Sequence, residues 1–266
     1  MSKGFIMANE TRALIGYTGF VGQTLIKQTS FTDFYRSTNI SDIKGRCFDT
    51  IVCSGAPAVK WLANKEPEKD QQSIDLLIDC LKQARCKKII LISTVDVFSD
   101  ANGVDEKTHV ETHGLHPYGL NRYRLENFVR DNFDDYLIIR LPGLVGPNLK
   151  KNIVYDFLNK NNINAIDSRG VFQFYPMVNL WSDIKIALSA NLRLVHLTSE
   201  PISVKEVAQE AFNMTFDNEV LSQPANYDFQ TLYGDVYSSH KKYQYSKKEV
   251  LLAIRAYAQS EQVTKS

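Results

Sequence analysis

Three glycines at three-residue spacing constrain this chain more than any other feature of its sequence. They stand between an apolar segment at 12–17, which predicts a β-strand, and a helical pattern from Phe20 to Thr29. Glycines at such a turn permit a tight bend and let the backbone approach a pyrophosphate, which the free N–H groups at the helix start would bind. The alternative is a turn in which the glycines serve backbone geometry alone. We expect a dinucleotide site at Gly16, Tyr17, Thr18, Gly19, Phe20, Val21 and Gly22.

Strand-like and helix-like segments alternate through the first half of the chain, which favours parallel βαβ units. The pattern predicts a short strand ending near Tyr35 and further strands at Thr50–Ser54, Lys88–Thr94 and Tyr136–Leu141. Helical periods cover Glu68–Arg85 and residues 118–132. We therefore expect an α/β fold in which residues 1–150 form a doubly wound parallel Rossmann sheet.

Beyond residue 150 the pattern is less regular. It predicts a helix near 152–161, short strands near Ala165 and Val195, a helix from Ser203 to Phe212, and a last helix from Ser246 to Ala258. Ser203 and Glu206 have the spacing of a capping box. We expect residues 151–266 to form a small C-terminal α/β substrate lobe packed on the sheet domain.

The charge balance excludes several classes of partner. The chain has 31 basic and 30 acidic residues, a net charge of +1, so it offers no overall field to a nucleic acid or an anionic membrane. Its longest apolar runs are far below the roughly 20 residues that span a bilayer. The segment around Phe5 and Met7 lacks the apolar core of a signal peptide, which favours a cytoplasmic protein.

The cysteines and histidines offer little for a metal. Four cysteines occur without a Cys-x-x-Cys pair, which predicts reduced thiols at Cys47, Cys53, Cys80 and Cys86. Three histidines cluster in a polar loop without a supporting cysteine. We interpret His109, His113 and His116 as solvated loop residues and expect no metal site.

An arginine follows the second strand at the place where a dinucleotide's adenosine ribose is met. About 20 residues after the first glycine, an acid suits the ribose 2′-hydroxyl of NAD, whereas an arginine suits the 2′-phosphate of NADP. Arg36 and Ser37 stand there, while Asp33 precedes the expected strand end. We therefore favour NADP over NAD, with a merely exposed Arg36 as the alternative.

Five segments together resemble the extended short-chain dehydrogenase/reductase superfamily, which includes nucleotide-sugar epimerases, dehydratases and reductases. They follow one another in the family's order over residues 12–147. The Ser-Thr-x-Asp-Val-Phe segment is most similar to the dTDP-4-dehydrorhamnose reductase group. The segments are the Gly-x-x-Gly-x-x-Gly turn, Asp49–Ala56, Leu91–Phe98, His116–Arg122 and Ile139–Gly146.

The resemblance implies roles for individual residues. It implies that Thr94 donates a hydrogen bond to a substrate carbonyl and that Tyr118 acts as general acid or base. It also implies cofactor contacts from the loop after the third strand and from the loop beside the nicotinamide. Those residues are Ser54, Gly55 and Ala56, and Pro142, Gly143 and Leu144.

One position departs from the family pattern, because Arg122 stands where the family has a lysine four residues after the tyrosine. On a helix Tyr118 and Arg122 share a face, so we expect the guanidinium to lower the pKa of the phenol and to hold the ribose. A planar guanidinium cannot reproduce all contacts of an ammonium.

Three functions remain open at this point. The resemblance implies an NAD(P)-dependent reductase that acts on a nucleotide-sugar-like substrate by hydride transfer, with a homodimer left open. Arg122 and the short lobe favour instead a catalytically silent cofactor-binding protein that senses NADP or supports a partner protein. An epimerase or dehydratase is the third hypothesis, against which Val95 and Asp96 replace the Asp-Glu pair of sugar dehydratases.

Overall fold

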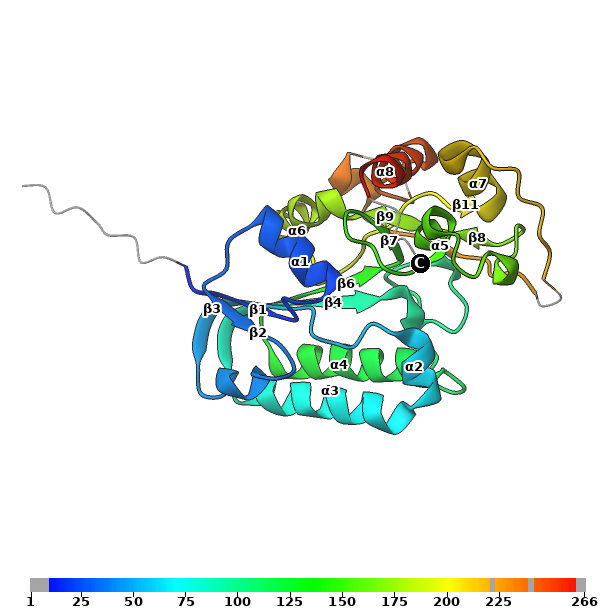
Figure 1. The fold of residues 1–266 in the computed structure, drawn as a ribbon. Coiled ribbons are helices and arrows are strands. Elements are labelled where there is room, and N and C mark those ends of the chain that lie inside the picture. The colour runs from blue at the N-terminus through cyan, green and yellow to red at the C-terminus, as the bar shows by residue number, and fades with distance from the viewer. Residues whose placement is uncertain (1–9, 221–222, 239–241, 262–266) are drawn as a thin grey trace, which may run out of the picture.

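A six-stranded sheet forms the middle layer of the protein (Figure 1). The computed structural model describes residues 10–220, 223–238 and 242–261; the amino-terminal segment considered for a signal peptide lies outside them. The strand order is β10-β6-β4-β3-β1-β2, and all neighbours run parallel, which confirms the α/β class. The strands are β1 (Arg12–Ile15), β2 (Asp33–Tyr35), β3 (Cys47–Cys53), β4 (Arg85–Thr94), β6 (Tyr136–Leu141) and β10 (Leu194–His196).

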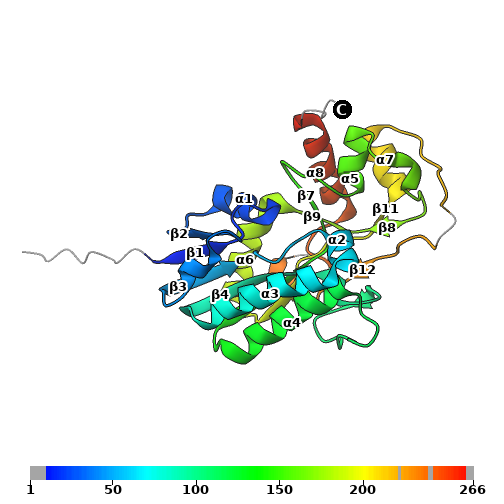
Figure 2. The same ribbon diagram turned by 60° about the horizontal axis from the view of Figure 1, so that its bottom comes forward.

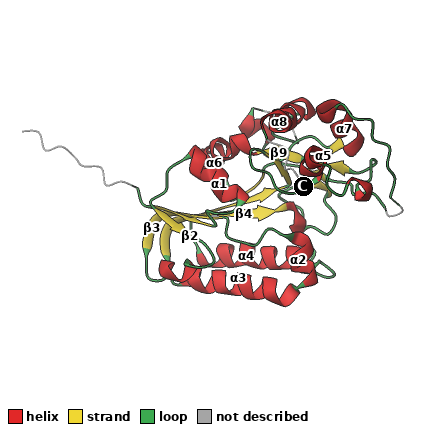
Figure 3. Ribbon diagram, viewed as in Figure 1, coloured by secondary structure: helices red, strands yellow, loops and turns green. Residues whose placement is uncertain are grey.

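Helices cover both faces of this sheet, as Figure 3 shows. One face carries α3 (Pro67–Lys82) and α4 (Pro117–Asn132), and the other carries α1 (Phe20–Gln28) and α6 (Leu180–Ser189). The alternation of a strand explains both layers: Ala13 packs in the core under α3 and α4, whereas Leu14 packs in the core under α1 and α6. A short helix, α2 (Lys60–Lys65), lies at one end of α3 and α4 (Figure 2).

The sheet has a point at which its strand order reverses. From β1 the chain goes to β2 on one side and then to β3 on the other side. In open parallel sheets, ligands bind in the crevice beyond the carboxyl ends of the strands at such a point. The loops after β1 and β3, which carry Gly16 and Ser54, therefore flank the expected ligand site.

The rest of the chain builds a further core beside the sheet. It contains the strand pair β7 (Gly143–Val145) and β9 (Phe174–Pro176) with three helices. The helices are α5 (Ile153–Asn159), α7 (Val204–Phe212) and α8 (Lys247–Ser260). Two short strand pairs complete this part: β8 (Val171–Phe172) with β11 (Ile202–Ser203), and β12 (Asp228–Phe229) with β5 (Asn102–Val104). The 3₁₀ turns are η1 (Ile40–Ile43), η2 (Val95–Val97), η3 (Ile163–Ala165), η4 (Met177–Asn179) and η5 (Gly234–Tyr237).

Several sequence expectations for this second half can be compared with the structure. The capping box at Ser203 and Glu206 is present, and the strand at Val195 is β10. The strand expected near Ala165 is wrong: the segment is η3, because Asn162 before it has a left-handed φ of 48° and turns the chain. A boundary at residue 150 assigns α6 and β10 to the lobe, although both pack on the central sheet.

The cysteines are free thiols, as predicted: Cys53 and Cys80 are buried, Cys86 is half-buried and Cys47 is exposed. Burial raises the pKa of the Cys53 thiol to about 11, which makes it a poor nucleophile at neutral pH. Among the described helices, none is both long enough and apolar enough to cross a membrane.

Candidate functional site

The glycine turn connects β1 to α1 under tight steric limits. Gly16 has a φ of +86°, and its N–H donates to the Tyr35 carbonyl at 2.8 Å. A Cβ on Gly16 would stand 2.4 Å from the Ser54 carbonyl oxygen, and one on Gly22 would stand 2.2 Å from the Gly16 carbonyl oxygen. A Cβ on Gly19 would meet only that same oxygen, at 3.4 Å. Gly16 and Gly22 are therefore required by the fold, whereas packing leaves room at Gly19.

The start of α1 offers free backbone donors. Gly19 is the N-cap and supplies no side-chain cap, and the first turn contains no acidic residue. Thr18 and Gly19 are exposed, while Phe20 and Val21 pack partly against the core. The Tyr17 ring meets Phe34 edge-on at 5.6 Å. Backbone N–H groups at an uncapped helix start with a partial positive charge suit a phosphate.

The residue expected at the adenosine ribose lies at the carboxyl end of β2. Arg36 is exposed; its backbone N–H donates to Asn39 and its Nε donates to the Thr38 hydroxyl at 2.9 Å. Ser37 is exposed beside it. The competing acid, Asp33, begins β2 and forms an ion pair with Arg46 at 2.7 Å. Asp33 is therefore committed at the opposite end of its strand.

The loop after β3 lies against the glycine turn. The Ser54 hydroxyl donates to the Ile15 carbonyl at 2.9 Å, and Gly55 and Ala56 follow it, half-buried. The segment beside the expected nicotinamide position continues from β6: Pro142 is buried, and Gly143 and Leu144 belong to β7.

Thr94 and Tyr118 meet at the carboxyl end of β4. Thr94 is the last residue of the strand, and its side chain lowers the pKa of the neighbouring Tyr118 phenol. The Thr94 hydroxyl oxygen accepts the Asp96 N–H at 3.2 Å and lies 3.3 Å from a carboxylate oxygen of Asp96. The Tyr118 side chain is only 8% exposed. The structure thus brings together two hydroxyl side chains that lie 24 positions apart in the sequence.

The start of α4 fixes the tyrosine in this place. His116 is its N-cap and accepts the Gly119 N–H through Nδ1 at 3.0 Å. A Cβ on Gly119 would lie 2.1 Å from the Asp96 carbonyl oxygen, so only glycine lets the helix approach the turn at Thr94. Asn64 of α2 accepts the Tyr118 N–H at 3.0 Å. His116 therefore has a capping role, unlike the solvated role predicted for it.

Arg122 lies on the same face as Tyr118, and its guanidinium carbon is 3.9 Å from the centre of the Tyr118 ring. It forms a buried ion pair with Asp70 of α3 and also donates to the Pro57 carbonyl. A third, longer bond of 3.3 Å reaches the Tyr118 carbonyl. Both terminal nitrogens are thus bound within the protein.

The pKa of Tyr118 departs from the expectation. Burial raises the pKa of the Tyr118 phenol above its usual value, and the Arg122 charge and the Thr94 side chain oppose that rise without cancelling it. The expected decrease follows from the Arg122 charge alone, and the loss of water around the buried phenol outweighs it. In this structure Tyr118 is protonated at neutral pH, which suits a proton donor.

Two charged groups at this site were not identified as functional from the sequence. Lys60, at the start of α2, forms an ion pair of 2.6 Å with Asp96, and burial lowers its pKa while Asp96 raises it, with a net rise. Asp70 is buried on α3, where the amphipathic pattern predicts only a helix surface. Neither residue lies in a recognisable motif, so no sequence signal marks it.

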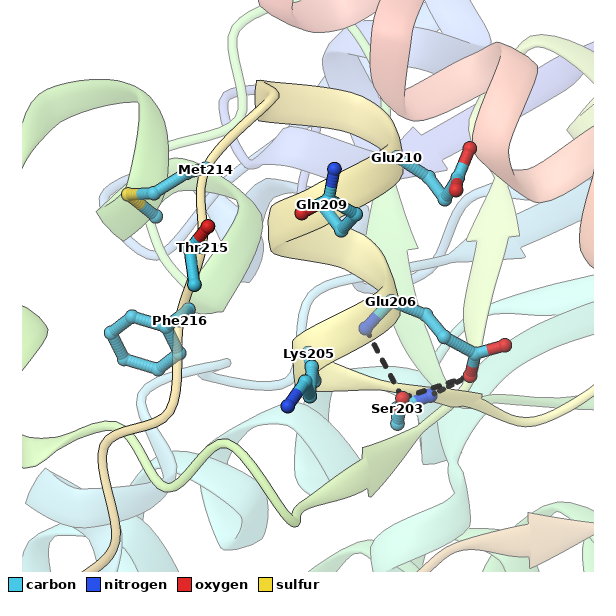
Figure 4. A pocket seen from close by; sticks show the side chains of 8 residues that line it. All are labelled: Ser203, Lys205, Glu206, Gln209, Glu210, Met214, Thr215 and Phe216. Carbon is cyan, nitrogen blue, oxygen red and sulfur yellow. Dashed lines mark hydrogen bonds between the residues drawn. The ribbon is translucent and has the colours of Figure 1, made fainter.

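A pocket also lies away from these residues, at α7 (Figure 4). Ser203 and Glu206 at one end are hydrogen-bonded to each other as the capping box. None of the residues predicted to bind a cofactor lines this pocket. Within the described residues, no three His, Cys, Asp or Glu side chains gather as they would around a metal ion.

Comparison with solved structures supports the fold. dTDP-4-dehydrorhamnose reductase from Clostridium acetobutylicum aligns with a TM-score of 0.72 and 15% identity, over 94% of this chain and 98% of that one. The Bacillus anthracis reductase, solved with NADP, gives 0.73 and 17% over 96% and 100%. UDP-N-acetylglucosamine 4-epimerase from Methanobrevibacter ruminantium gives 0.71 and 14% over 95% and 98%.

No family model and no curated protein matches the sequence. The structural likeness agrees with the resemblance found in the five sequence segments and extends it beyond residue 150. The chain therefore has the Rossmann fold of the sugar-nucleotide reductases and epimerases.

Proposed function

We propose that the protein is an NAD(P)-dependent oxidoreductase that transfers hydride to or from a carbonyl or hydroxyl carbon of a nucleotide-sugar-like substrate. The observation that carries this proposal is the placement of Thr94, at the carboxyl end of β4, beside the buried Tyr118. These residues lie at the same carboxyl end of the sheet as the glycine turn and the loop after β3, where the strand order reverses.

The residues at the turn fit a dinucleotide. Packing leaves room beside Gly19, and the N-terminus of α1 has no side chain of its own to cap it. We assign the pyrophosphate to the α1 start at Gly19, the adenosine ribose to Arg36 and Ser37, and the flanking loops to Ser54–Ala56 and Pro142–Leu144. Because Arg36 is exposed and Asp33 is paired elsewhere, NADP is favoured over NAD.

The chain's own residues would handle the proton. A nicotinamide cofactor, when bound, supplies or accepts the hydride. In the reductive direction Thr94 would donate a hydrogen bond to the substrate carbonyl oxygen, and Tyr118 would deliver its proton to that oxygen as negative charge develops there. The raised pKa of Tyr118 keeps this proton available through the neutral range. The Arg122 guanidinium, which lies over the Tyr118 ring, would limit this rise in the Tyr118 pKa.

The similar structures support the substrate class. They include two dTDP-4-dehydrorhamnose reductases and an epimerase solved in complex with UDP-N-acetylmuramic acid, which is a nucleotide sugar. Lys60 and Lys151 stand near Asp96 at the site, and among the described residues Lys151 forms no ion pair with a carboxylate. An anionic substrate fits this charge. The epimerase neighbour keeps epimerisation as an alternative for the same site.

One observation favours a catalytically silent cofactor-binding protein instead. Arg122 is held by Asp70 and Pro57, so its nitrogens do not point freely toward a ribose. A protein of this kind would bind NADPH tightly and reduce nothing.

The test begins with calorimetric titration of NADPH, NADP and NADH. A panel of 4-keto nucleotide sugars is then added to the NADPH complex, and the loss of NADPH absorbance is followed for wild type and for Tyr118→Phe. We expect oxidation with at least one sugar that Tyr118→Phe abolishes. Tight NADPH binding without oxidation by any candidate would establish the silent protein, and absence of NADPH binding would refute both.

A further inference from the structure

Lys60, which lies outside the family-like segments, forms an ion pair with Asp96 close to Tyr118. The Lys60 ammonium lies 2.6 Å from one oxygen of Asp96, and the other oxygen of Asp96 lies 3.3 Å from the Thr94 hydroxyl. The Thr94 side chain in turn interacts with Tyr118 and lowers the pKa of its phenol. Lys60, Asp96 and Thr94 thus form a series of polar contacts that begins on α2 and ends beside the proton donor.

The fold holds this series of polar contacts in place from two sides. Lys60 and Asn64 are four residues apart on α2 and therefore share a face, and Asn64 binds the backbone of Tyr118. From the other side, the close approach of Gly119 to the Asp96 carbonyl presses α4 against the turn that carries Asp96. Burial raises the pKa of Tyr227, which precedes β12, and Lys60 opposes that rise.

The Thr94 hydroxyl has a single proton, so it cannot serve two acceptors. When Thr94 donates to the Asp96 carboxylate, it can only accept from Tyr118, and the phenol stays protonated. When Thr94 donates to Tyr118 or to a substrate oxygen, Asp96 loses that hydrogen bond. The Lys60 ammonium makes the Asp96 carboxylate a weaker acceptor for the Thr94 proton, because it already neutralises the negative charge of Asp96.

We propose that Lys60 and Asp96 are positioning residues that decide where the Thr94 proton is donated and hence how readily Tyr118 releases its own. The proposal rests on the function proposed above for Thr94 and Tyr118. In this proposal Lys60, which lies on α2 and not on the helix of Tyr118, supplies part of the positive charge that acts on the phenol. The other part comes from Arg122, whose charge Asp70 partly offsets.

The charges around Tyr118 agree with this role. Arg122 and Lys60 lower the Tyr118 pKa, whereas Asp96 raises it. His116, whose ring centre is 6.3 Å from that of Tyr118, has its own pKa lowered by burial and by Lys60. Lys151 interacts with Asp96 and Arg122, and burial lowers its pKa. Lys60 therefore opposes the rise in the Tyr118 pKa that Asp96 causes.

The experiment measures the Tyr118 titration directly and does not need turnover. Protein labelled with 3-fluorotyrosine, whose phenol is more acidic, is titrated by fluorine NMR, and Tyr118→Phe identifies the signal. Lys60→Met should raise the pKa of Tyr118 by about 0.5 to 1, a modest shift because the Lys60 side chain is 41% exposed. Asp96→Asn should lower that pKa. In the Asp96→Asn background the Lys60→Met shift should be smaller, because only the direct effect of the Lys60 charge on the phenol then remains.

Lys65→Met is the matched control, since Lys65 is exposed at the end of the same helix. An unchanged Tyr118 titration in Lys60→Met, or a Lys60→Met shift that persists in full in the Asp96→Asn background, would overturn the proposal. Where a substrate is found, the pH profile of kcat for alcohol oxidation should move to higher pH in Lys60→Met with KM little changed. If the variants shift the Tyr118 pKa as expected but no substrate is turned over, this inference holds while the proposed function fails.

Discussion

Arg122 gives the sharpest stability prediction, because its ion pair with Asp70 is almost fully buried, with 4% and 3% of the two side chains exposed. Arg122→Met keeps the apolar stem and removes the guanidinium, so the Asp70 carboxylate is left with the Asn121 amide at 2.8 Å as its partner. Breaking a buried pair in this way costs about 3–5 kcal/mol. For a domain of this size, that loss lowers Tm by roughly 6–15 °C. Urea unfolding measures the free energy and thermal melts measure Tm.

Two further variants separate the buried pair from ordinary surface charge. Arg124 and Asp75 join the same two helices at 2.8 Å but are 39% and 49% exposed, so Arg124→Met should cost less than about 1 kcal/mol. Arg122→Met combined with Asp70→Leu removes both buried charges and should recover most of the loss. If Arg122→Met cost no more than Arg124→Met, the pair would not hold α4 to α3.

The other predictions concern ligands and turnover. Gly19→Val should stay folded and lose NADPH, whereas Gly22→Val should fail to fold because its Cβ would lie 2.2 Å from a backbone oxygen; circular dichroism with NADPH titration distinguishes them. Arg36→Ala should weaken NADP by about ten- to a hundredfold and leave NAD unchanged, and equal losses would refute the assignment. Tyr118→Phe should reduce turnover by on the order of 10²–10⁴ with NADPH affinity intact, and Thr94→Val should act less than additively with it. Normal NADPH oxidation by Tyr118→Phe would exclude it as the proton donor.

The layers of the fold were predictable because local signals and tertiary structure agree there. β1, α1 and β6 lie where period and glycine placement indicate, since each buries the apolar face that its pattern defines. α2 could not be predicted: Lys60–Lys65 is only one and a half turns long, and Trp61 and Leu62 on it are exposed. Its helical form depends on contacts with α3 and α4, which no local pattern records.

The candidate site was predictable only where its residues belong to a motif. Thr94, Tyr118 and the glycine turn belong to segments with a recognisable order, and the structure brings Thr94 and Tyr118 together. Asp70 and Lys60 became visible only from the packing of α3 and α2, because a charged residue on a helix is ordinarily solvated. The same limitation explains the error about Tyr118, since burial is a property of the assembled fold and outweighs the neighbouring charge.

The residue at position 122 shows why a motif substitution cannot be judged by its own side chain. A guanidinium has more donors than an ammonium, and here two acceptors on neighbouring elements, Asp70 and Pro57, take its terminal nitrogens. The Tyr118 ring then contacts the flat face of the group, so Arg122 acts on the phenol through its charge and not through a hydrogen bond. Because Asp70 offsets part of that charge, the balance at Tyr118 depends on the nearest other ions, Asp96 and Lys60. A lysine introduced at 122 would still face Asp70, and for this reason Arg122→Lys alone should not give Tyr118 the charge control that the sequence resemblance implies.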